Sequence, residues 1–259
     1  MSGLSNRLPS ALTLHDLMPP DPKAVLLVGS HARGWAHESS DVDVIVVVEQ
    51  PISDPRAGGI EVALQPERVQ AVATYADDAR LEVKYWLTGQ IDQVLDKVSW
   101  DAFEHSDTLN DQLDEQSKIM LDHMMTCVPL AGEPWVQALR ERIRDSAFRA
   151  FLVDAALNRC DDKAESALGM LASGDPHSAV LAAREAFGFA IDALLLGQGE
   201  FNLHRKWRAR RFRELAPGSM SYAQYWEWET MRGLDPEAPE RWVEAIVRLC
   251  KNVWLDIDV

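Results

Sequence analysis

The sequence predicts an α+β protein, with a small mixed-sheet domain over residues 1–130 and an all-helical bundle domain over residues 131–259. Two observations support this division. Short strand-like and helix-like segments alternate in the first half, whereas the second half has an apolar period of about 3.6 residues and almost no strand signal. This change in sequence pattern follows the turn-forming segment Val128–Pro134.

Four segments of the first half have the length and the pattern of β-strands. The run before Gly29 is short and apolar and follows a proline-rich turn, which is typical of a buried strand. The segment around Glu82 instead alternates, with Glu82, Lys84 and Trp86 on one face and their apolar neighbours on the other. The expected strands span residues 23–28, 41–48, 60–64 and 79–87.

Helical periodicity accounts for most of the remaining chain. In the first half it predicts helices over residues 30–37, 66–77 and 90–100. In the second half, glycine-containing breaks at residues 174–176 and 197–199 separate the helices. The expected helices of the second half span residues 135–159, 161–172, 177–196, 205–215, 221–231 and 239–254.

Composition and charge argue against several classes of protein. The formal net charge of −15 disfavours extended contact with nucleic acid, whose phosphates it repels, and favours cationic partners. The sequence lacks the roughly 18 uninterrupted apolar residues of a membrane-spanning helix, and its N-terminus lacks the apolar run of a secretory signal. Scattered cysteines predict reduced thiols and a cytoplasmic protein without a membrane association.

The stretch VGSHARGWAHESSDVDVIVVV, residues 28–48, joins two expected strands and carries the candidate chemistry. Asp41 and Asp43 are two residues apart on a strand, so their side chains share one face and their carboxylates repel each other. A divalent cation relieves this repulsion, and carboxylate oxygens suit Mg²⁺. Glu82 adds a third carboxylate, either for metal binding or as the base that accepts a proton from an attacking hydroxyl.

The Gly-Ser pair of this stretch suits a phosphate-binding turn. Gly29 lets the backbone approach a ligand closely, and a helix that starts at Ser30 offers free N–H donors. Arg33 adds a cation that can contact a phosphate through two hydrogen bonds. One short stretch therefore has the groups to hold a nucleoside triphosphate and the Mg²⁺ that bridges its phosphates.

These residues resemble the signature of the DNA polymerase β-like nucleotidyltransferase superfamily: Gly-Ser, a helical turn that often holds Ala-Arg-Gly, and Asp-x-Asp on the next strand. The residues that match the signature are Gly29, Ser30, Ala32, Arg33, Gly34, Ser40, Asp41 and Asp43. The resemblance implies Mg²⁺-dependent transfer of a nucleoside monophosphate from a nucleoside triphosphate, with release of pyrophosphate. It also places Ser40 among the nucleotide-binding residues.

Other segments resemble aminoglycoside adenylyltransferases, whose second domain is a helical bundle. Leu81–Val83 is similar to the strand whose glutamate acts as general base, here Glu82. Pro129–Gly132 is similar to the junction between the two domains. Lys206 matches by pattern a lysine that approaches the triphosphate from the second domain.

The leading hypothesis is an adenylyltransferase that moves AMP from ATP to a hydroxyl of a small, cationic, aminoglycoside-like molecule, as in antibiotic resistance. Lys84 and Trp86, on the face of Glu82, are the candidate acceptor-binding residues. Two alternatives stay open: a nucleotidyltransferase that modifies a protein or tRNA, as toxin–antitoxin transferases do, and a non-catalytic nucleotide-binding regulatory module. The acceptor, the choice between ATP and GTP, the number of metal ions and the oligomeric state also stay open.

Overall fold

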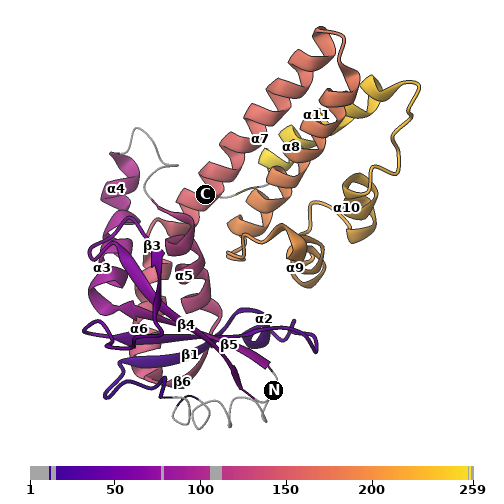
Figure 1. Cartoon of the computed structure of the whole chain (residues 1–259). Coiled ribbons are helices and arrows are strands. Elements are labelled where there is room, and N and C mark those ends of the chain that lie inside the picture. Colours follow the sequence, from indigo (N-terminus) through magenta and orange to yellow (C-terminus); the bar gives the residue numbers. More distant parts are fainter. Residues whose placement is uncertain (1–11, 13–15, 77–78, 106–112, 256, 258–259) are drawn as a thin grey trace. The chain divides into compact units, whose positions relative to one another are not determined.

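A computed structural model describes residues 12, 16–76, 79–105, 113–255 and 257 of the chain. The chain divides between Ala147 and Phe148 into two compact units (Figure 1). The first unit is built around a mixed sheet and the second is helical, which confirms the predicted α+β class. The cysteines are buried and free, and no helix among the described residues has the length and apolar character needed to cross a membrane.

The first unit is organised by a six-stranded sheet with the order β3-β4-β5-β2-β1-β6. The strands are β1 (Ala24–Val28), β2 (Val42–Val48), β3 (Gly58–Glu61), β4 (Arg68–Ala76), β5 (Ala79–Leu87) and β6 (Val128–Ala131). Among these described strands, β2 and β5 pair in parallel and the other neighbours pair antiparallel. The sheet is therefore mixed, as predicted, and its parallel pair lies at the centre.

The parallel pair brings the sequence patterns of β2 and β5 into register. Asp43 lies beside Glu82 and Val47 lies beside Trp86, so these residues share one face of the sheet. The alternate residues, such as Val44, point to the other face and belong to a hydrophobic core. Both faces of the central strands are thus covered along most of their length, which explains the unbroken apolar run of β2.

The first unit also contains helices, and most of them pack on a strand of the sheet (Figure 1). They are α2 (Gly29–Ala32), α3 (Thr88–Lys97), α4 (Trp100–Glu104), α5 (Glu115–Thr126) and α6 (Glu133–Asp145). Helix α3 packs on β5, α5 on β1, and α6 on β1 and β6. The Asp114 side chain accepts a hydrogen bond from the backbone N–H of Ser117, which fixes the start of α5.

The structure corrects several predicted elements. The break predicted at residue 160 lies instead at residues 146–147, because one helix runs without interruption from Phe148 to Ala172. The helix predicted over residues 66–77 is wrong, because residues 68–76 form β4, which hydrogen bonds with β3 on one side and β5 on the other. The helix predicted over residues 30–37 is the single turn α2, and the third predicted strand begins earlier, at Gly58. Helices α4 and α5 and strand β6 had no counterpart in the sequence-based prediction.

The second unit consists of helices around a hydrophobic core. They are α7 (Phe148–Ala172), α8 (Pro176–Gly197), the 3₁₀ helix η2 (Arg205–Trp207), α9 (Arg208–Leu215), α10 (Tyr222–Glu229) and α11 (Pro239–Leu255). Helix α8 is apolar on most sides because it contacts α7, α9, α10 and α11. The division after Ala147 differs from the predicted one after residue 130, because α6 packs on the sheet and so belongs to the first unit.

A buried ion network ties α9 to α8. Asp192 on α8 accepts hydrogen bonds from Arg208 at 2.6 and 3.0 Å and from Arg211 at 2.9 Å. The arginine side chains are 8% and 0% exposed, so loss of Asp192 would leave two positive charges without their buried counter-ion. These two basic residues of the second unit therefore have a structural role.

Candidate active site

The turn after β1 closely approaches a carboxylate of β2. Val28, the last residue of β1, pairs with Asp43 across the sheet, so Gly29 begins α2 next to the Asp43 side chain. Gly29 has a φ of 67°, and a Cβ atom at this position would lie 2.8 Å from Oδ2 of Asp43. Glycine alone combines this backbone conformation with this free space. The position of Asp43 thus explains the Gly-Ser pair of the motif.

Three carboxylates meet at the amino ends of the two parallel strands. Asp43 and Glu82 are neighbours in the β2–β5 register, and Asp41 immediately precedes β2. Burial raises the pKa of Asp43 above its ordinary value, the nearby Lys84 ammonium lowers this pKa, and the charges of Glu82 and Asp41 raise it. A further positive charge among these groups would stabilise the ionised form of Asp43.

Two basic side chains of β5 contact these carboxylates. Nη1 of Arg80 lies 2.6 Å from Oδ2 of Asp41, and its Nη2 lies 3.5 Å from Oε2 of Glu82. Nζ of Lys84 lies 3.2 Å from Oε1 of Glu82. The side chains of Arg80 and Asp41 are 42% and 41% exposed, so this end of the site is open to solvent.

The donor set fits a magnesium ion. Within the described part of the chain, no group of three or more His, Cys, Asp or Glu side chains is gathered as a metal site. The reason is visible in the contacts, since Asp41 pairs with Arg80 and Glu82 pairs with Lys84 and Arg80. The donors are nevertheless carboxylate oxygens, which Mg²⁺ prefers.

Hydrogen bonds tie the loop between α2 and β2 to the Gly29 turn. The backbone carbonyl of Ser30 accepts hydrogen bonds from the N–H groups of Trp35 at 2.8 Å and Ala36 at 3.1 Å. Oγ of Ser40 accepts a hydrogen bond of 2.9 Å from the backbone N–H of His37. These bonds order the segment in which Ser30 and Ser40 flank the carboxylates, and their contact with a nucleotide stays a prediction.

Arg33 is engaged within the protein. Its Nη2 lies 2.5 Å from Oδ1 of Asp122 on α5, and its guanidinium lies 4.7 Å from the ring centroid of Trp35. The Arg33 and Asp122 side chains are 7% and 6% exposed. Because a buried ion pair is costly to break, this contact favours a structural role that fixes α2 on α5. The phosphate contact predicted for Arg33 rests on the motif alone.

The two predicted acceptor-binding residues have different environments. Lys84 is 21% exposed and contacts Glu82. Trp86 is 2% exposed and lies four positions along the strand, about 13 Å from Glu82 at strand spacing. Trp86 is therefore packed in the core, and its predicted contact with an acceptor stays a prediction. Alternation assigned its face of the sheet but gave no information on how deeply that face is covered.

Lys206 lies in the second unit, on η2. Its Nζ is 5.4 Å from the ring centroid of Trp207. A shallow hollow of about 810 Å³ is lined by Lys206, Trp207, Ala209, Arg210, Arg213, Glu214, Tyr222 and Trp226. The hollow combines positive charge with aromatic faces. The predicted contact of Lys206 with the triphosphate stays a prediction.

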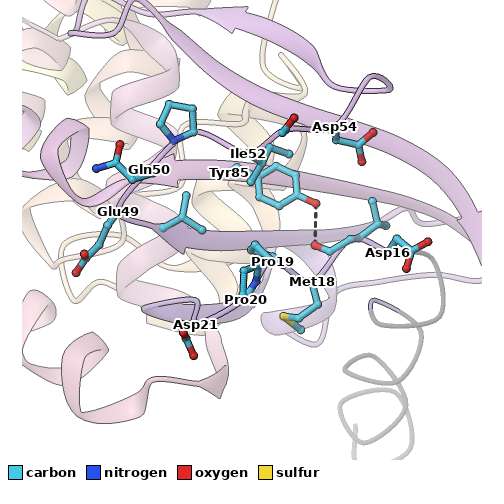
Figure 2. Close-up of a pocket in the computed structure, with 14 residues that line it drawn as sticks. Asp16, Met18, Pro19, Pro20, Asp21, Glu49, Gln50, Ile52, Asp54 and Tyr85 are labelled. Carbon is cyan, nitrogen blue, oxygen red and sulfur yellow. Dashed lines mark hydrogen bonds between the residues drawn. The ribbon is translucent and has the colours of Figure 1, made fainter.

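The first unit also has a hollow of about 630 Å³, which Figure 2 shows with its lining residues. Tyr85 lines it and donates a hydrogen bond of 2.8 Å from its hydroxyl to the backbone carbonyl of Leu17. Val48, at the carboxyl end of β2, also lines it, whereas Asp43 lies near the amino end of that strand. Tyr85 and Glu82 point to opposite faces of β5. This hollow is therefore separate from the carboxylate site.

Comparison with known proteins finds a family match within the first unit. The family model described as the nucleotidyltransferase domain matches residues 13–118. The chain contains a nucleotidyltransferase domain. The matched residues include the Gly29 turn and the three carboxylates of the site. No curated protein matches the chain.

Solved structures agree with a nucleotidyltransferase fold. The chain is similar to the nucleotidyltransferase-like protein from Exiguobacterium sibiricum 255-15, with a TM-score of 0.51 and 11% sequence identity. The likeness covers 97% of this chain and 74% of that chain, and at such an identity it shows the fold alone. The domain match supports the DNA polymerase β-like superfamily that residues 29–43 predicted, whereas the resemblance to aminoglycoside adenylyltransferases stays a prediction.

Sequence reasoning missed two residues of the first unit. Arg80 contacts Asp41 and Glu82, and its signal was its position on the alternating strand, two residues before Glu82. Asp122 is the partner of Arg33 although it lies 89 residues away, and no local pattern could have indicated the pair.

Proposed function

We propose that the chain is a magnesium-dependent nucleotidyltransferase that moves a nucleoside monophosphate, AMP from ATP in the leading hypothesis, to a hydroxyl of a small cationic molecule. The observation that carries the proposal is the position of Asp43 beside Glu82 and the Gly29 turn, with Asp41 linked to Glu82 through Arg80. The match of residues 13–118 to the nucleotidyltransferase domain supports nucleotidyl transfer in general.

In this proposal the residues of the motif bind the triphosphate. Asp41 and Asp43 would hold Mg²⁺, whose charge offsets the negative charge that develops on the phosphates during transfer. Gly29 permits close approach of the backbone, and the hydroxyls of Ser30 and Ser40 are hydrogen-bond donors for phosphate oxygens. The raised pKa of Asp43 supports its assignment as a ligand, because this carboxylate gains most from a nearby cation.

Glu82 is the base of the proposed reaction. It accepts the proton of the acceptor hydroxyl while the oxygen of that hydroxyl forms a bond to the α-phosphorus and the bond to pyrophosphate breaks. A contact with Lys84 at 3.2 Å orients its carboxylate. The pyrophosphate leaves with the electron pair of the broken bond, so each proton and charge is accounted for.

The charge of the chain favours a cationic acceptor. A net charge of −15 attracts molecules that carry several ammonium groups, such as an aminoglycoside-like amino sugar. The same charge repels the phosphate backbone of tRNA, so a small molecule is the preferred acceptor. Transfer to a protein or to tRNA is a distinguishable outcome of the assay.

The assay combines the full chain with Mg²⁺, each labelled nucleoside triphosphate in turn, and a panel of aminoglycosides, tRNA and proteins. Pyrophosphate release and a mass gain of one nucleoside monophosphate are the readouts. We expect both readouts with ATP and a small cationic acceptor. A panel in which no acceptor and no nucleotide yields pyrophosphate would reject the proposal.

Two conservative substitutions separate the roles of the carboxylates. Asp43→Asn should abolish transfer and metal-dependent nucleotide binding, and Glu82→Gln should retain nucleotide binding and lose transfer. Glu61→Gln, an exposed carboxylate on the edge strand β3, is the matched control and should keep full activity. Normal turnover of Asp43→Asn would contradict the metal assignment, and normal turnover of Glu82→Gln would exclude this residue as the base.

A further inference from the structure

Arg80 occupies the carboxylates that a metal ion would need. Its guanidinium contacts Asp41 at 2.6 Å and Glu82 at 3.5 Å at the same time. Asp41 is a proposed metal ligand, and Glu82 is the proposed base. A divalent cation that binds Asp41 must therefore compete with the positive charge of Arg80 for the same carboxylate.

The exposure of this ion pair allows it to exchange partners. The Arg80 and Asp41 side chains are 42% and 41% exposed, whereas those of the Arg33–Asp122 pair are 7% and 6% exposed. Water competes for an exposed pair, which contributes little to stability, but separating a buried pair leaves charges in a low dielectric. Tyr75, the register partner of Arg80 on β4, is itself 69% exposed, so this neighbour does not enclose Arg80.

An arginine released from carboxylates has a suitable second partner in a phosphate. The planar guanidinium donates two parallel hydrogen bonds to a phosphate as readily as to a carboxylate. The proposed function brings a triphosphate to Asp41 together with the metal ion. The triphosphate therefore reaches the site when the metal ion displaces Arg80 from Asp41.

We propose that Arg80 is a further nucleotide-binding residue, which pairs with Asp41 and Glu82 before the ligands bind and moves to the triphosphate when metal and nucleotide bind together. The inference rests on the proposed function. Its consequence is a coupling between the binding of the two ligands. A metal ion alone competes with Arg80 for Asp41, whereas a bound nucleotide draws Arg80 away from this carboxylate. Each ligand then binds more tightly in the presence of the other.

The test measures binding instead of turnover. Mn²⁺ replaces Mg²⁺, and electron paramagnetic resonance quantifies the free ion during titration of the full chain, with and without α,β-methylene ATP. Arg80→Gln should bind Mn²⁺ alone about thirtyfold more tightly, because Mn²⁺ carries two charges and a unit positive charge about 4 Å away changes its affinity by about this factor in water. The same variant should bind Mn²⁺ together with the analogue several-fold more weakly than the wild type does.

One further variant separates the effect of the charge of Arg80 from the effect of its shape, and another serves as a control. Arg80→Lys keeps the charge and loses the planar fork, so it should retain wild-type Mn²⁺ affinity and lose part of the affinity for the analogue. Arg142→Gln removes another exposed arginine, which pairs with Asp92 at 2.9 Å with side chains 53% and 55% exposed. This control should leave both affinities unchanged.

The outcomes separate this inference from the proposed function. If Arg80→Gln binds Mn²⁺ no more tightly than the wild type, or binds the analogue equally well, the exchange of Arg80 is rejected. If Asp43→Asn keeps wild-type binding of Mn²⁺ and the analogue, the ligands bind away from the carboxylates and the proposed function itself fails. Two results together support the exchange of Arg80 and the proposed function. Arg80→Gln binds Mn²⁺ more tightly and the analogue more weakly than the wild type, and Asp43→Asn loses the binding of Mn²⁺ and of the analogue.

Discussion

Gly29→Ala should disable the candidate site while leaving the protein folded. The substitution places a methyl group between the turn after β1 and the side chain of Asp43. The carboxylate must then rotate out of its position beside residue 29. We therefore expect loss of transfer and of metal-dependent nucleotide binding.

The magnitude follows from two features of the Gly29 position. At a φ of 67° an alanine backbone costs about 1–2 kcal/mol relative to glycine. The new Cβ would lie 2.8 Å from Oδ2 of Asp43, well inside an ordinary contact of about 3.5 Å. The crowded atom is the end of a side chain, so rotation of Asp43 relieves the contact. The free energy of unfolding should therefore fall by about 1–2 kcal/mol.

Gly34→Ala is the matched control for this prediction. Gly34 has a similar φ of 70°, but nothing lies within 4 Å of a Cβ atom at its position. It should lose a similar free energy of unfolding in urea denaturation and keep both transfer activity and Mn²⁺ binding. Wild-type transfer by Gly29→Ala, or an equal loss of activity in both alanine variants, would refute the reasoning.

Other consequences of the structure can be measured by urea denaturation. Asp122→Asn leaves the buried charge of Arg33 without its carboxylate, so the free energy of unfolding should fall by about 3–5 kcal/mol; a loss below about 1 kcal/mol would show that the pair is dispensable. Because the pKa of folded Asp43 is raised above 3.8, the contribution of Asp43 to wild-type stability should fall as the pH rises from this value through the folded pKa. In the presence of a chelator, Asp43→Asn should lack this fall and should be more stable than the wild type at neutral pH. Parallel pH profiles of the two proteins would contradict the raised pKa of Asp43. Trp86→Ala removes a core side chain and should cost about 3–5 kcal/mol while the folded protein keeps its activity; lost activity at wild-type stability would return Trp86 to the acceptor site.

Strand β5 shows what the local sequence determines. The alternation around Glu82 predicts a strand over residues 79–87, and β5 has these bounds. In β4, by contrast, the buried residues Val69 and Val72 are three positions apart, which imitates helical spacing. That strand forms because β3 and β5 provide hydrogen-bond partners on both sides, and a local pattern contains no information on such partners.

The residues of the candidate site likewise differ in whether the local sequence predicts them. The glycine turn and the two aspartates were predictable because one short stretch contains them all. The ion pairs were not, because the register of β2 and β5 brings Arg80 to Asp41 across 39 residues of sequence. The depth of Trp86 likewise depends on helices that cover its face of the sheet, and strand alternation does not report them.

The parallel pairing of β2 and β5 also bears on how this chain can diverge. Between Val48 and Ala79 the chain forms β3 and β4, which lie beyond β5 in the sheet, before it returns to lie beside β2. The spacing of Asp43 and Glu82 is set by the register of the two central strands. It does not depend on the length of the segment between Val48 and Ala79. Insertions and deletions there can remodel the surroundings of Glu82 while the spacing of the carboxylates is inherited unchanged.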